Sequence, residues 1–288
     1  MHKEITLAKH SGFCYGVKRA VETVKKLKAE NPEKNIFVLG ELIHNSHVIA
    51  ELDAMGIKTI YEIPEHGSGI CVIRSHGASP ETFEKAKQAG FEVVDLTCPD
   101  VKKVQQKAIE LVQNGYYLII VGKAEHPEVM AIYANAKQYG DKISIINFPE
   151  QLASISTELK SHKKVGVVVQ TTQRISTLND VLTALTPLCK EIFVANTICP
   201  STSLRQNEAK ELAQSADLMV VVGSKKSANT THLAEILTKI TKTVHIEDDT
   251  ELNSEIFKDA EKISITAGAS TPEDIINNVI EKIKRKGE

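Results

Sequence analysis

Three stretches of the 288-residue sequence begin alike, with a cysteine followed by an amphipathic helical pattern. The three cysteines are Cys14, Cys98 and Cys199. Apolar residues recur every three or four positions behind each of them, which is the spacing of a helix with one buried face. Proline follows two of these cysteines directly, at Pro99 and Pro200, and proline suits the first position of a helix. The pattern therefore predicts each cysteine at a helix N-terminus.

The three stretches also continue alike beyond the first helix. Each helix leads into an apolar strand that ends in glycine, at Gly40, Gly122 and Gly223, which lie 26, 24 and 24 positions after their cysteines. Four residues later a polar residue is expected to open a second helix, and these residues are His44, His126 and Ser227. In the third stretch the helix face expected to be buried consists of Leu204, Ala209, Leu212 and Ala213.

Further strands and a helix complete each unit. Short strands are predicted at Ile57–Ile60, Ile143–Ile146 and Thr243–Ile246, and the strands after them at Ile70–Arg74, Val165–Gln170 and Ile263–Thr266. Polar loops follow this second set, and Ser79–Pro80 and Thr271–Pro272 are expected to cap the next helices. A closing strand then leads to the next cysteine, and the N-terminal segment ITLAKHSGFC takes this role before Cys14.

Alternating strands and helices, with strands that are apolar throughout, indicate parallel sheets covered by helices. We expect an α/β protein of three pseudo-equivalent domains: residues 15–97, residues 98–195, and residues 196–288 closed by residues 1–14. A threefold arrangement would bring the matching loops, and all three cysteines, to one central point. The alternative is one long doubly wound sheet with unrelated buried cysteines, and the matched spacing argues against it.

Composition excludes several classes of protein. The formal net charge is −2, with 35 basic and 37 acidic residues, so the chain has no overall field that would attract nucleic acid or an anionic membrane. The N-terminal residues lack the apolar stretch of a secretory signal, and the longest apolar runs are the length of strands. Five cysteines without a signal peptide argue against a disulfide framework. We therefore expect a cytoplasmic protein with reduced thiols.

Three thiols at helix N-termini suit a soft metal site. The positive end of the helix dipole favours the thiolate, which is the form that binds metal. Zinc usually takes four ligands from closely spaced pairs, and the chain has no CxxC pair. A four-iron cluster normally takes four cysteines, so three would leave one iron open to a substrate oxygen. Spacing alone leaves a cluster, zinc or a catalytic thiol open, and Cys71 and Cys189 are expected to be structural.

The loops expected to face the same centre carry imidazoles, hydroxyls, an amide and glycine backbone, mostly near helix N-termini. This set suits recognition of a phosphate or diphosphate, although neither GxxxxGK[ST] nor GxGxxG is present. Glu128 stands in the first turn of a predicted helix. It is either an acid that complements the helix dipole or a proton donor beside the open iron, and the pattern does not decide between the two.

Eight motifs in register across nearly the whole chain resemble those of one known family. They are FCYGVKRAV, GELIHN, RSHGAS, DLTCPDV, GKAEHPEV, VVQTTQ, VVGSKKSAN and TAGASTP. The chain resembles the family of 4-hydroxy-3-methylbut-2-enyl diphosphate reductase, the last enzyme of the non-mevalonate isoprenoid pathway. The resemblance implies three α/β domains around one 4Fe–4S cluster with one open iron, held by Cys14, Cys98 and Cys199.

The resemblance also implies the roles of other residues. Glu128 is expected to supply protons, with help from Thr171 and His126. The residues expected to bind the substrate are His44, His76, His126, Thr171, Ser227, Asn229 and Ser270. The family often has SKNSSN where this chain has SKKSAN, so that Ala228 replaces a hydroxyl and Lys226 an amide, and one hydrogen bond to the diphosphate is expected to be lost or supplied by backbone.

The implied reaction is reductive dehydroxylation of the substrate to isopentenyl and dimethylallyl diphosphate, with electrons arriving singly from a ferredoxin or flavodoxin. No nucleic acid or membrane partner is expected. Two alternatives remain from the residues alone. A cluster-dependent hydro-lyase also needs an open iron but turns over without a reductant, and a cluster- or zinc-binding sensor has no catalysis and little use for Glu128.

Overall fold

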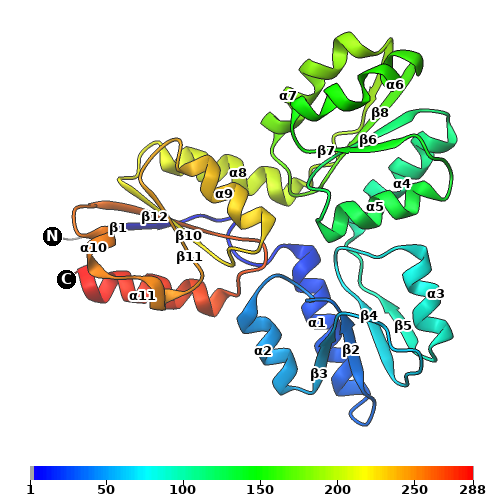
Figure 1. Cartoon of the computed structure of the whole chain (residues 1–288). Coiled ribbons are helices and arrows are strands. Elements are labelled where there is room, and N and C mark those ends of the chain that lie inside the picture. Colours follow the sequence, from blue (N-terminus) through cyan, green and yellow to red (C-terminus); the bar gives the residue numbers. More distant parts are fainter. Residues whose placement is uncertain (1–2, 288) are drawn as a thin grey trace. The chain divides into compact units, whose positions relative to one another are not determined.

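The computed structural model describes residues 3–287, and within them the strands form three four-stranded sheets of the same topology (Figure 1). The paired strands of these sheets all run parallel. The first sheet has the order β3(Ile57–Ile60), β2(Ile36–Leu39), β4(Ile70–Ile73), β5(Glu92–Asp95). The second has the order β7(Ile143–Ile146), β6(Tyr117–Val121), β8(Lys164–Val169), β9(Glu191–Val194). The third has the order β11(Thr243–Ile246), β10(Leu218–Val222), β12(Lys262–Ala267), β1(Glu4–Leu7).

The central strands are apolar throughout because helices cover both of their faces. In β10, Leu218, Val220 and Val222 pack in one core cluster that includes residues of α11(Glu273–Gly287). The intervening Met219 and Val221 belong to a second cluster with residues of α8(Pro200–Ala213) and α9(Ala228–Leu237). The period of two along a strand thus divides each central strand between two helical layers.

The remaining helices follow the order expected from the repeat. The α-helices are α1(Tyr15–Glu30), α2(Ser46–Ala54), α3(Pro80–Gln88), α4(Pro99–Gln113), α5(Pro127–Lys137), α6(Ser156–Ser161), α7(Ile175–Leu185) and α10(Ser254–Phe257). Three short 3₁₀ helices are also present among the described residues, at η1(Pro149–Ile155), η2(Thr186–Leu188) and η3(Asp249–Glu251). None of the helices in the described part of the chain is long and apolar enough to cross a membrane.

Each repeat cysteine lies immediately before a helix, at α1, α4 and α8. Each also donates its backbone N–H to the carbonyl that lies two residues beyond the third strand of its sheet. The pairs are Cys14 to Ala269 at 3.1 Å, Cys98 to Ser75 at 2.9 Å and Cys199 to Thr171 at 3.0 Å. The threefold sequence repeat is therefore a repeat of backbone geometry as well.

Residue contacts divide the chain into two compact units. Unit 1 consists of Met1–Glu22, Ile43–Met55 and Pro200–Glu288, and unit 2 of Thr23–Leu42 and Gly56–Cys199. Unit 1 contains the sheet with β10, and unit 2 contains the other two sheets. The predicted boundaries of three domains stay a prediction, and their ends at residues 1–2 and 288 lie outside the described residues.

Three local predictions differ from the structure. Asn45, and not His44, caps α2, because its side chain accepts the N–H of Val48 at 3.2 Å. Thr271 does not directly precede α11, which begins at Glu273, and its hydroxyl donates to the carbonyl of Val222 at 3.0 Å.

The third difference concerns the buried face of α8. Leu204 is 50% exposed, and the buried positions of that helix include Thr202, Arg205 and Gln206. The helix is thus turned so that polar side chains enter the protein.

Candidate active site

Polar side chains gather where the central strands end in glycine. A Cβ on Gly122 would lie 2.8 Å from Oε1 of Gln170, and a Cβ on Gly223 would lie 2.3 Å from Oγ1 of Thr271. Gly223 also has a φ of +137°, which side chains rarely tolerate. The repeated glycines therefore let a polar side chain from the neighbouring strand end approach the backbone.

The most perturbed acid of unit 2 is Glu128, which is 1% exposed in the first turn of α5. Thr171 donates twice to its carboxylate, from the backbone N–H to Oε1 at 2.6 Å and from the hydroxyl to Oε2 at 2.7 Å. Burial raises the pKa of Glu128 from 4.5 to about 7, against the lowering effect of the two hydrogen bonds from Thr171. A carboxyl with such a pKa can hold and release a proton near neutral pH.

Thr171 connects this acid with a cysteine. Its carbonyl accepts the backbone N–H of Cys199, and its own N–H and hydroxyl contact Glu128. Thr171 thus fixes the carboxyl of Glu128 and the backbone of Cys199 relative to each other.

One histidine of unit 2 contacts Glu128, and a second histidine contacts the first. His126 caps α5, and its Nδ1 accepts the backbone N–H of Glu128 at 3.2 Å. A neutral ring that accepts at Nδ1 carries its proton on Nε2, which makes that edge a donor. The ring of His76 meets that of His126 edge-on, with centroids 5.3 Å apart. Asn135 of α5 holds the loop of His76 by donating to the carbonyl of Ala78 at 3.0 Å.

Unit 1 carries the other predicted substrate-binding residues. Ser227 is the N-cap residue of α9, but its side chain makes no capping hydrogen bond. Asn229 is 4% exposed, and its Nδ2 has no hydrogen-bond partner among the described residues. Ser270 donates its hydroxyl to the carbonyl of His44 at 3.3 Å. A buried amide donor without a partner is costly unless a ligand satisfies it, so this helix N-terminus suits an anion.

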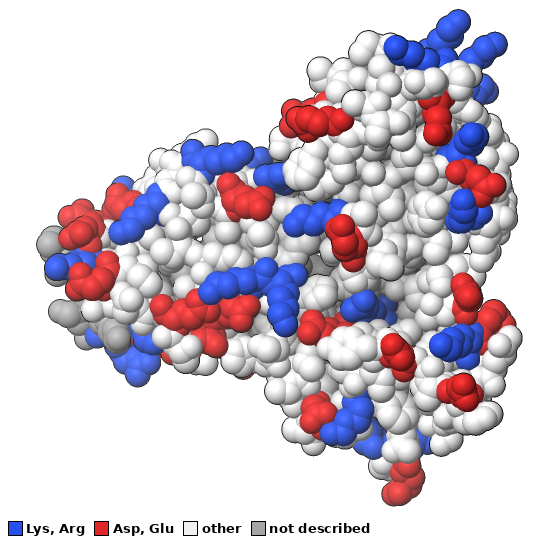
Figure 2. All heavy atoms as spheres, in the orientation of Figure 1, with Lys and Arg blue, Asp and Glu red and all other residues white. Residues whose placement is uncertain are grey.

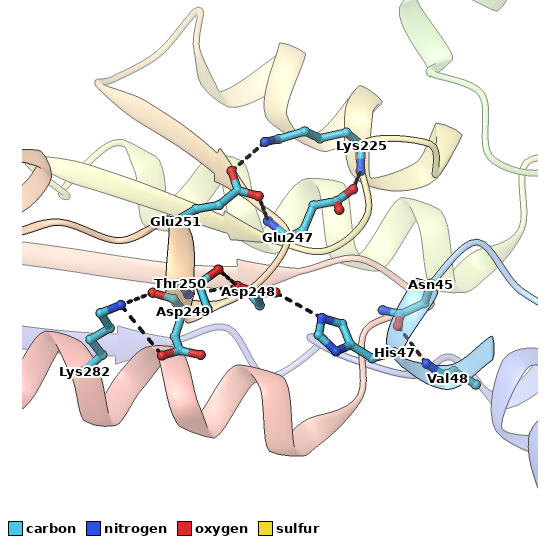
Figure 3. A network of polar contacts seen from close by, with 10 residues as sticks. All are labelled: Asn45, His47, Val48, Lys225, Glu247, Asp248, Asp249, Thr250, Glu251 and Lys282. Atoms are coloured by element: carbon cyan, nitrogen blue, oxygen red, sulfur yellow. Dashed lines mark hydrogen bonds and ion pairs between the residues drawn. The ribbon is translucent and has the colours of Figure 1, made fainter. Parts of the chain in front are cut away.

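A polar network anchors two of these segments to the same turn (Figure 3). Lys225, in the loop before α9, donates its backbone N–H to Glu247 at 2.8 Å and places its Nζ 2.5 Å from Glu251. His47, in the first turn of α2, places Nε2 3.0 Å from Oδ2 of Asp248. The turn from Glu247 to Glu251 therefore holds both the loop that precedes Ser227 and the segment that carries His44.

The five cysteines separate into two classes. None of the five, all of which the structure describes, forms a disulfide. Cys71 is 0% exposed inside β4, and burial raises the pKa of its thiol, as it also does for the partly buried Cys189. The three repeat cysteines are half-buried and stand at helix N-termini. Partly accessible thiols at helix N-termini, outside any disulfide, are the soft donors that an iron–sulfur cluster takes, so this donor set fits such a group.

The predicted site residues are divided between the two units. Unit 2 carries His76, His126, Glu128 and Thr171 together with Cys98 and Cys199, and unit 1 carries His44, Ser227, Asn229 and Ser270 together with Cys14. Figure 2 shows basic and acidic side chains interspersed over the face drawn, as the net charge of −2 leads one to expect.

The comparisons with known proteins decide the family. The model of the LytB protein family matches residues 5–284. The chain belongs to this family. A 4-hydroxy-3-methylbut-2-enyl diphosphate reductase of Geobacter sulfurreducens is 42% identical over 99% of this chain and 100% of its own length. The enzyme of the same name from Geobacter metallireducens is 40% identical, over 98% of this chain and 97% of its own.

Solved structures agree with this LytB assignment. One is described as (E)-4-hydroxy-3-methyl-but-2-enyl diphosphate reductase, the terminal enzyme of the non-mevalonate pathway. It has a TM-score of 0.73 at 36% identity, and the match covers 98% of this chain and 99% of that one. The E-1-hydroxy-2-methyl-but-2-enyl-4-diphosphate reductase of Plasmodium falciparum has a TM-score of 0.89 at 28% identity, covering 98% and 88%.

Membership of the LytB family confirms the predicted family, the α/β fold class and the class of enzyme, an oxidoreductase. The relatives are named as reductases, which disfavours both a hydro-lyase and a sensor without catalysis.

The sequence analysis missed the residues that support the site. Arg205, Glu208, His47 and Asp248 were not singled out, although each makes contacts that fix a site-bearing segment. Arg205 and Glu208 lie three positions apart, next to the buried Ala209. This helical spacing was the sequence signal that could have placed them on the inner face of the helix. The pair of His47 and Asp248 lies 201 positions apart, and no sequence pattern pointed to it.

Proposed function

We propose that the chain carries out the reductive dehydroxylation of (E)-4-hydroxy-3-methylbut-2-enyl diphosphate to isopentenyl diphosphate and dimethylallyl diphosphate. Beyond family membership, the observation that supports this most is Glu128. Its buried carboxyl, with a pKa of about 7, stands in contact with Thr171 and next to the capping histidine His126. A reaction that expels hydroxide from carbon needs such a proton donor.

We infer that Cys14, Cys98 and Cys199 hold one 4Fe–4S cluster with one iron left without a protein ligand. The inference rests on the equivalent positions of the three thiols in the repeat and on their partial exposure. When bound, the cluster supplies electrons singly and a Lewis acid for the hydroxyl oxygen. Zinc remains the less suitable occupant, because three thiolates at separate helix termini lack its usual fourth ligand.

The substrate diphosphate is bound by His44, His76, His126, Ser227, Asn229 and Ser270, and Thr171 completes the substrate-binding set. The partnerless Nδ2 of Asn229 and the hydroxyl of Ser227, which makes no capping bond, supply donors at the N-terminus of α9. The positive end of that helix favours the anion. The two imidazoles of unit 2 add donors from a second set of loops.

Glu128 moves the proton. Near pH 7 its protonated and ionised forms are both populated, because burial raises its pKa to about 7. In the protonated form it gives its proton to the oxygen of the departing hydroxyl, which leaves as water. Thr171 fixes the carboxyl, and its two hydrogen bonds stabilise the carboxylate that remains. The balance of two electrons and two protons is completed by a second proton, which adds to carbon.

The electrons come from a small one-electron carrier, a ferredoxin or a flavodoxin, which would dock at the protein surface. This part of the proposal rests on the resemblance. The cytoplasmic location also stays a prediction.

The proposal is tested by anaerobic turnover. The purified chain, with its cluster, is mixed with (E)-4-hydroxy-3-methylbut-2-enyl diphosphate with and without a one-electron reductant. We expect isopentenyl and dimethylallyl diphosphate, detected by mass spectrometry, only when reductant is present, with two electrons consumed per product. Conversion of the substrate without a reductant would contradict the proposal and favour a hydro-lyase.

A further inference from the structure

Helix α8 carries a buried arginine that binds backbone far away in sequence. Arg205 is 3% exposed and lies six positions beyond Cys199. Its Nη1 donates to the carbonyl of His10 and, at 2.8 Å, to that of Ala267, and its Nη2 donates to the carbonyl of Gly12 at 3.0 Å. A planar guanidinium satisfies three carbonyls at fixed angles, which a lysine cannot do.

Glu208, three residues further along α8, accepts hydrogen bonds from the backbone N–H groups of the same segment. Its Oε1 accepts the backbone N–H of Lys9 at 2.7 Å, and its Oε2 accepts that of His10 at 2.7 Å. Oε2 also lies 2.8 Å from Nδ1 of His10. Although burial opposes ionisation, these hydrogen bonds lower the pKa of Glu208, so the carboxylate is ionised at neutral pH.

The segment that these two residues hold leads directly to a proposed cluster ligand. It lies between the end of β1 at Leu7 and Cys14, which precedes α1. The backbone N–H of Cys14 is itself held by the carbonyl of Ala269, two residues beyond the carbonyl of Ala267 that Arg205 binds. Arg205 therefore links the segment before Cys14 to the loop whose carbonyl accepts the backbone N–H of Cys14.

We propose that Arg205 and Glu208 are positioning residues that hold the segment Lys9–Gly12 so that the thiol of Cys14 is placed to ligate the cluster. The proposal rests on the proposed function, in which Cys14 is a ligand. Both residues belong to the helix that begins after Cys199, so the helix of one cysteine orients the segment of another within unit 1.

The test compares Arg205→Met, Arg205→Lys and Glu208→Gln with the wild type. Two controls alter the same helix elsewhere: Glu211→Gln, at an exposed side chain, and Lys210→Met, at a half-buried one. The readouts are iron and acid-labile sulfide per chain after anaerobic purification, the rate of iron loss to a chelator, the electron paramagnetic resonance spectrum of the reduced cluster, and the melting temperature of the cluster-free protein.

We expect Arg205→Met to lose iron about tenfold faster than the wild type, because three carbonyls lose their donor, two of them in buried hydrogen bonds. Arg205→Lys and Glu208→Gln should lose it about threefold faster, since each keeps part of the contacts, and the reduced-cluster spectrum should change in all three. The two controls should match the wild type. A structural role alone would lower the melting temperature of the cluster-free protein and leave the spectrum of the remaining cluster unchanged, and that result would overturn the proposal.

Should Arg205→Met fail to fold, Arg205→Lys and Glu208→Gln decide the matter. Wild-type rates of iron loss and a wild-type spectrum in both would also overturn the proposal. Cys14→Ser separates this failure from failure of the proposed function. If Cys14→Ser loses the cluster while the α8 variants retain it as the wild type does, only the positioning role is wrong. If Cys14→Ser retains the cluster fully, the ligand set itself is wrong.

Discussion

At the scale of single residues, the proposed chemistry depends on the protonation of Glu128. Burial raises its pKa to about 7, so the protonated donor disappears as the pH rises through that value. We therefore expect the single-turnover rate of the wild type to fall above about pH 7. Glu128→Gln should retain the cluster, lose this pH dependence and slow the reaction by about 10²–10⁴-fold, the usual contribution of a positioned proton donor. Unchanged turnover in that variant would place the proton source elsewhere.

The hydroxyl of Thr171 provides a second test of the same carboxyl. Its hydrogen bond to Oε2 favours the carboxylate and so lowers the pKa of Glu128. Thr171→Val removes that bond, and the alkaline limb of the pH–rate profile should move to higher pH while the rate falls. Thr183→Val is the matched control, because the hydroxyl of Thr183 is exposed and bonds within its own helix. A shift to lower pH in Thr171→Val would contradict the assigned interaction.

Glu128 should also cost the protein stability at high pH. A carboxyl whose pKa in the folded state is raised contributes stability below its ordinary value of 4.5, and this stability is lost as the pH rises through about 7. Glu128→Gln carries no such charge. The variant should therefore melt at a higher temperature than the wild type at pH 8, with a smaller difference or a reversed one at pH 5. Calorimetry of the cluster-free proteins at both pH values measures this, and an equal difference at both would be inconsistent with a buried titrating carboxyl.

At the scale of elements, the central strands were predictable because a strand buried on both faces is apolar throughout. The cysteine-bearing helices were predictable from apolar residues at every third or fourth position. The strands at Ile57–Ile60, Ile143–Ile146 and Thr243–Ile246 have the predicted bounds. Prediction failed where polar side chains choose among backbone partners. Asn45 takes the cap expected of its neighbour His44, and the hydroxyl of Thr271 turns to the carbonyl of Val222.

Helix α8 shows the same limit. Its apolar spacing placed Leu204 inside, but the structure buries Arg205, whose contacts come from residues near the other end of the chain. Of the site, the sequence indicated the cysteines and the polar loops by their repeat. The residues that hold those loops in place, such as Arg205, do so through contacts between distant parts of the chain. Such contacts produce no periodic pattern in the sequence.

The contact between His47 of α2 and Asp248 supports the segment of His44, a residue that we propose to bind the substrate. His47→Ala removes the contact between α2 and the turn that carries Asp248, which loosens the segment of His44 (Figure 3). The side chains of His47 and Asp248 are 46% and 19% exposed, so the pair is worth at most about 1 kcal/mol. We expect the KM for the diphosphate substrate to rise by up to about fivefold, with kcat within twofold.

Lys284→Ala is the control for this prediction, since it breaks an exposed ion pair with Glu281 on α11 of the same unit. Steady-state kinetics under anaerobic conditions distinguishes the two variants. A loss of kcat with an unchanged KM in His47→Ala would show that the pair does not act through substrate binding.

At the scale of the whole molecule, one arrangement is used three times. Each sheet has the same strand order, and each cysteine backbone is held by the loop after the third strand of its own sheet. Such equivalence places three thiols in the same local setting, although they are spread over 186 positions from Cys14 to Cys199. We therefore propose that these three cysteines act together as one ligand set, and that Cys71 and Cys189 do not belong to it.

The most direct test is iron and acid-labile sulfide per chain, measured after anaerobic purification of the wild type and of single Cys→Ser variants. We predict about four of each in the wild type and in Cys71→Ser, as a single four-iron cluster requires. Cys14→Ser, Cys98→Ser and Cys199→Ser should each lose most of both. Full iron and sulfide in any of these three, or loss of the cluster in Cys71→Ser alone, would contradict the account.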